Sequence, residues 1–65
     1  MKERNVKGLK EWLKVEIEKS ERMENDYWEM YEESKKQYFY QLSLQYFAKA
    51  EAYKKVLSEI KMLDN

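Results

Sequence analysis

The chain has 65 residues, of which 40% are charged, yet its acidic and basic side chains balance to a formal net charge of zero. A monomer of this size buries only a thin core, and the chain has no cysteine for a disulfide and no histidine for metal binding or general-base chemistry. The hydrophobic fraction of 43% and the balanced charge do not fit a disordered chain, which combines low hydrophobicity with high net charge.

The first half of the chain predicts an amphipathic helix over about residues 5–33. Asn5 is a favourable N-cap for it. On a heptad template Glu16 and Ser20 fill two polar slots of an otherwise apolar stripe. That stripe consists of Val6, Leu9, Leu13, Met23, Tyr27 and Met30. Seven basic and ten acidic residues give positions 1–33 a net charge of −3.

The second half predicts a helix over about residues 36–63. It contains the segment YFYQLSLQYFAKAEAY (residues 38–53), whose first ten residues are uncharged and include five aromatic residues. The alternation in this segment also fits a strand, but the residues after it are strongly helical and offer no partner strand. Lys49 fills the one polar slot of the stripe Phe39, Leu42, Tyr46, Tyr53, Val56, Ile60 and Leu63.

The two stripes do not fit one straight helix. Met30 and Phe39 are nine residues apart, which puts the stripes about half a turn out of phase. If the chain folds back near Ser34, the stripes face each other and pair positions such as Leu13 with Val56. The polar slots then meet mid-way along the pair, where they can fix the register. We therefore predict an all-α antiparallel helical hairpin that dimerises into a four-helix bundle.

The position of the turn has two interpretations. Ser34 and Gln37 form a Ser-x-x-Gln capping box that could start the second helix. Asn25 and Asp26 are a stronger turn signal, and Asp26 with Glu29 also reads as a capping box. The turn near Ser34 is the main prediction because it leaves two helices of similar length.

The residues that could carry chemistry do not indicate an enzyme. Glutamates spaced three apart occur in the first half and could hold a hard cation, but a di-iron bundle also needs histidine. A solvated acidic face is the simpler interpretation. No glycine-rich phosphate loop is present, because Gly8 is the only glycine. We expect no enzymatic activity, no cofactor and no metal.

An excess of aromatic residues remains after the two stripes are paired. A hairpin buries one stripe per helix, and exposed apolar patches are typical of subunit or partner interfaces. We predict homodimerisation and a protein partner through the candidate interface Trp12, Trp28, Tyr31, Tyr40, Leu44 and Phe47. The alternatives are a single-stranded nucleic-acid binder, which the pI near 6.3 disfavours, and a purely structural coiled coil.

The segment YFAKAEAYKKVLSEI (residues 46–60) resembles the C-terminal helix of short α-helical proteins of phages and mobile elements from AT-rich bacteria. The resemblance covers about a quarter of the chain and implies an accessory or regulatory protein that binds host or phage proteins. It implies no functional residues. No run of 18 apolar residues and no apolar signal region follow the N-terminus, so we expect a cytoplasmic protein with no membrane role.

Overall fold

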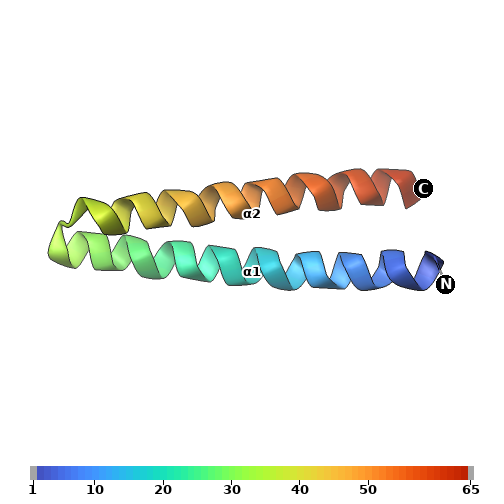
Figure 1. Ribbon diagram of the computed structural model, residues 1–65, viewed down its shortest axis with the longest axis horizontal. Helices are drawn as coiled ribbons and strands as arrows, with labels where there is room; N and C mark the ends of the chain where they lie inside the picture. The colour runs from blue at the N-terminus through green and yellow to red at the C-terminus, as the bar shows by residue number, and fades with distance from the viewer. Residues whose placement is uncertain (1, 65) are drawn as a thin grey trace.

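The computed structural model describes the backbone of residues 2–64 and the side chains of residues 7–63. Two helices, α1 (Lys2–Ser34) and α2 (Gln37–Asp64), run antiparallel and are joined by a two-residue turn (Figure 1). The hairpin measures 48 × 15 × 12 Å. The predicted all-α hairpin with a turn near Ser34 is confirmed. Asn25 lies inside α1 and residues 38–47 are helical, so the alternative turn and the alternative strand are wrong.

The N-terminal boundary differs from the prediction. Helix α1 already begins at Lys2, so Asn5 lies within the helix and its predicted N-cap position is wrong. Residues 2–4 are Lys, Glu and Arg, which are good helix formers and extend the helix past the expected cap. The side chains of Asn5 and Val6 lie outside the described range.

The turn ends α1 with a left-handed residue that is not glycine. Lys35 has φ 59°, and its N–H donates to the Tyr31 carbonyl at 2.6 Å. This is the single bond of an αL C-cap. The Ser34 hydroxyl donates to the Met30 carbonyl at 2.7 Å and accepts from the Lys36 N–H at 3.2 Å. Ser34 therefore closes α1 instead of capping α2, and the predicted capping box is wrong.

The seam between the helices is built on a seven-residue repeat that is rich in small side chains. Its buried members are Leu13 and Ser20 in α1 and Ser43, Ala50 and Leu57 in α2, each at most 9% exposed. In the antiparallel arrangement this repeat sets Leu13 against Leu57 and Ser20 against Ala50. Small residues at a crossing let two helices approach closely. The burial of the Ser43 hydroxyl is compensated because it donates to the Tyr40 carbonyl at 2.9 Å.

The observed seam is displaced by one residue of α2 from the predicted one. Ala50 and Leu57 occupy the seam where Lys49 and Val56 were predicted, and Val56 is 42% exposed. The template placed Lys49 in a polar slot of the seam, but the buried position is taken by its neighbour Ala50, whose side chain is small and apolar. The predicted seam position of Met30 is also wrong, because its side chain is 43% exposed.

The left-handed turn residue predicts a stabilising substitution. Lys35→Gly should be more stable than Lys35→Ala by about 1 kcal/mol, because glycine adopts positive φ without a Cβ clash. Both variants lose the ammonium group that lies 5.7 Å from the Tyr31 ring, so their difference isolates the backbone effect. Urea denaturation followed by circular dichroism measures it. Equal stability of the two variants would contradict the turn geometry.

The close approach of the helices predicts intolerance to volume at the middle of the seam. Ala50 is 1% exposed, so Ala50→Leu should destabilise the hairpin by about 1–3 kcal/mol through overpacking. Ala52 is exposed on the solvent side of α2, so Ala52→Leu serves as the matched control and should change stability by less than about 0.5 kcal/mol. Thermal unfolding followed by circular dichroism measures the stability of both variants. An Ala50→Leu variant as stable as the wild type would contradict the tight packing of Ala50 in the seam.

Candidate interaction surfaces

One aromatic cluster lies beside the turn and draws on both helices. The rings of Trp28, Tyr31 and Tyr40 form a closed triangle with centroid separations of 5.5, 6.0 and 5.4 Å. Leu44 and Phe47 continue it along α2, because residues four and seven positions after Tyr40 share its helix face. We call these five residues the turn-end cluster. Trp28, Leu44 and Phe47 are 42–48% exposed, so the cluster faces solvent.

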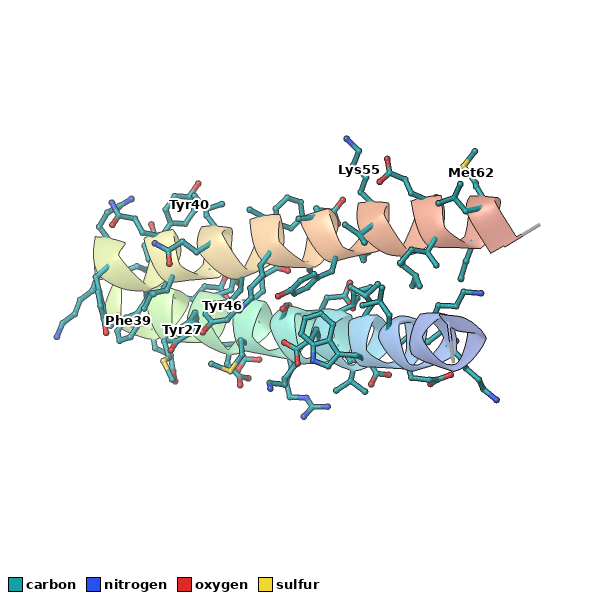
Figure 2. All side chains as sticks on the ribbon, turned by 45° about the vertical axis from the view of Figure 1, so that its right-hand side comes forward. Tyr27, Phe39, Tyr40, Tyr46, Lys55 and Met62 are labelled. Carbon is teal, nitrogen blue, oxygen red and sulfur yellow. The ribbon has the colours of Figure 1, made fainter. Side chains whose placement is uncertain are left out.

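A second aromatic row lies along the opposite edge of the seam. Tyr27 stacks between Phe39 and Tyr46 at centroid distances of 6.3 and 5.7 Å. Figure 2 shows these three rings gathered toward α1, whereas Tyr40 lies on the other side of α2. Farther from the turn, Tyr53 meets Trp12 edge to face at 5.6 Å. We call this surface the long face, because it extends over most of the hairpin.

The long face has more members than these rings. From helix periodicity it also contains residues on the same helix face, three, four or seven positions before or after one of these rings. They are Leu9, Glu16, Lys19, Met23 and Met30 of α1 and Leu42, Lys49, Val56 and Ile60 of α2. Leu9, Met30 and Val56 are 42–43% exposed, and Leu42, Met23 and Ile60 are half-buried.

The predicted interface is divided between these two surfaces. Five of its six residues are the turn-end cluster, and Trp12 is the exception. Trp12 and Trp28 are 16 residues apart, which is about 24 Å along the helix and about 160° around it. Trp12 therefore belongs to the long face.

Sequence reasoning missed the long face as a surface. Phe39, Tyr46 and Tyr53 were assigned to the buried seam, but they are half-buried at its edge. The available signal was steric: tyrosine and phenylalanine rings are too large to lie between backbones that Ser20 and Ala50 bring close together.

The middle of the long face is polar and hollowed. A hollow of about 180 Å³ is lined by Glu16, Lys19, Ser20, Met23, Tyr46 and Lys49. The Lys19 ammonium lies 3.6 Å from the Glu16 carboxylate, and the Lys49 ammonium lies 5.7 Å from the centroid of the Tyr46 ring. These residues include the predicted polar slots, so charges separate two apolar halves of this face.

The side of the hairpin that carries the turn-end cluster becomes charged farther from the turn. Lys54 joins the helices through an ion pair with Glu21 at 2.7 Å and also meets Glu51 at 3.3 Å. The hydrogen bond to Glu21, followed by the one to Glu51, raises the pKa of Lys54 above its ordinary value. This ion pair reflects the opposite net charges of the two halves of the chain.

The part of the chain that the structure describes shows neither a cluster of metal ligands nor a membrane-spanning helix. Among residues 2–64 no group of three or more acidic side chains is placed to hold a metal ion. No described helix combines the length and the apolarity that a membrane span requires.

Comparisons with protein-family models, curated proteins and solved structures find no match to this chain. The resemblance of residues 46–60 to phage and mobile-element proteins stays a prediction.

Proposed function

We propose that the protein is a non-catalytic binding module that acts as an adaptor or inhibitor. Two hairpins associate into a four-helix bundle, and the turn-end cluster of each copy binds a different protein. The observation that carries this proposal is the imbalance between core and surface. Among the side chains of residues 7–63, three apolar ones are buried, whereas eleven large apolar ones are at least 42% exposed.

The total exposed area supports self-association. The chain exposes 5394 Å², whereas a compact monomer of 8.1 kDa exposes about 4,500 Å². A standard protein interface covers about 800 Å² on each partner. The excess of about 900 Å² therefore matches one interface of ordinary size, and a second hairpin is a common solution for this topology.

The turn-end cluster supports a further, different partner. Trp and Tyr are the usual anchors of protein interfaces, because they bury a large area with few rotatable bonds. The contacts among Trp28, Tyr31 and Tyr40 hold the rings in place before a partner arrives, which lowers the entropic cost of binding. The resemblance to phage and mobile-element proteins fits an accessory role of this kind.

Self-association is tested by sedimentation equilibrium at micromolar concentrations. We expect a species of twice the 8.1 kDa chain mass, with a dissociation constant below about 10 μM for an interface of standard size. Helical circular dichroism recorded on the same samples shows whether the chain is folded. A folded hairpin that stays monomeric at 100 μM would contradict the proposal.

Partner binding is tested by affinity capture from a lysate of the source cells. Trp28→Ala/Phe47→Ala should lose the captured protein, because it removes two exposed anchors of the turn-end cluster. Val15→Ala/Met62→Ala is the matched control, since it removes two exposed apolar side chains outside the cluster. Equal capture by both variants would refute the role of the cluster.

The nucleic-acid alternative is tested by binding to labelled single-stranded oligonucleotides. Salt-dependent binding at micromolar concentrations would favour that alternative over the proposed protein partner.

A further inference from the structure

We propose that the long face is the surface on which the second copy docks, with the two hairpins antiparallel about a two-fold axis. This inference rests on the proposed self-association and adds which face is used and how the copies are oriented. The occupant of the long face is therefore a second copy of this chain, and the turn-end cluster remains exposed for the other partner.

The first argument is the symmetry of the long face. Its apolar residues lie toward both ends of the hairpin, and the charged residues that line its hollow lie in the middle. Trp12, Val56 and Ile60 lie toward the open end, Met30 and Leu42 lie toward the turn, and Glu16, Lys19 and Lys49 lie between them. A two-fold axis across the helices exchanges the ends, so apolar halves meet apolar halves.

The residues of α2 show this symmetry position by position. With the axis at the level of residue 51, Leu42 of one copy lies opposite Ile60 of the other. Tyr46 lies opposite Val56 in the same way. Lys49 then lies opposite Tyr53, where its ammonium can rest on a ring as it does on Tyr46 in its own chain. Apolar contacts on both sides of the axis thus enclose a polar centre that fixes the register.

The second argument is the size of the face. A hairpin 48 Å long and 15 Å wide presents a flat face of roughly 700 Å². That area is close to the roughly 800 Å² that each partner contributes to a standard interface. Only a surface that extends over the whole length of the hairpin reaches this size, and the apolar residues of the long face do so.

The opposite side of the hairpin does not suit the same symmetry. Its aromatic residues lie beside the turn, whereas Lys54 and Lys61, one and two heptads after Phe47, lie beyond the level of residue 51. A two-fold axis would set these charges against the rings of the other copy and take them out of water, which is costly. This surface therefore suits a different partner.

Cysteine cross-linking distinguishes the two faces without weakening either. The chain has no native cysteine, so single variants react at one site. Lys19 and Glu51 lie at the same level of the hairpin and are both exposed. Lys19 is one heptad from Trp12 on the long face, and Glu51 is one heptad from Leu44 on the other side. We expect a short bismaleimide to cross-link Lys19→Cys at least tenfold more than Glu51→Cys. Equal or reversed cross-linking would overturn the inference.

Charge insertion provides the second test. Val56→Glu places a carboxylate on the long face and should raise the dimer dissociation constant at least 100-fold in sedimentation equilibrium. Leu44→Glu is the matched control, because Leu44 is 47% exposed and Val56 is 42% exposed. It should leave the dimer dissociation constant unchanged within threefold. If Leu44→Glu dissociates the dimer and Val56→Glu does not, the assignment of the face fails while the proposed self-association stands. A wild-type chain that is monomeric overturns the self-association and this inference together.

Discussion

Two helices can bury only one stripe each, and in this chain the middle of that stripe is made of small side chains. Ser20 and Ala50 are 3% and 1% exposed and lie in the middle of the seam. The rings of Phe39, Tyr46 and Tyr53 are half-buried, so they lie at the edge of the seam and not in its centre. The aromatic surfaces on both sides of the hairpin follow from this narrow seam.

The hairpin itself could be predicted, because the phase difference between the two stripes requires a break, and a chain with no proline and a single glycine favours long helices. The register could not be predicted to the residue. The template set Lys49 and Val56 in the seam and their neighbours Ala50 and Leu57 beside it. Which of these two adjacent stripes is buried depends on how the partner helix packs against them, and a single helix does not reveal that. The left-handed backbone conformation of Lys35 could not be predicted either, because in a sequence only glycine or asparagine indicates such a position.

The candidate interface was likewise predictable only in part: its residues could be chosen from the sequence, but the face on which each one lies depends on helix packing. Counting apolar residues outside the stripes identified the turn-end cluster, since Trp28 and Tyr40 fall outside any heptad seam. It also grouped Trp12 with them, although Trp12 contacts Tyr53 on the opposite edge. Which edge a ring occupies depends on the rotation of each helix about its own axis. That rotation is set by the seam, so an error of one residue in the seam hides an entire face.

The apolar residues of the long face extend to both ends of the hairpin, whereas the turn-end cluster lies at one end only. In the proposed antiparallel dimer the turns lie at opposite ends of the bundle, and each copy presents its turn-end cluster on the side away from the dimer interface. The assembly then carries two equivalent binding sites that face different directions. Such a bundle favours partners that are themselves multivalent, because two linked binding events strengthen binding without any new contact. An inhibitor of oligomeric targets and a bridging adaptor both fit this geometry, whereas a monomeric target would occupy the two sites independently.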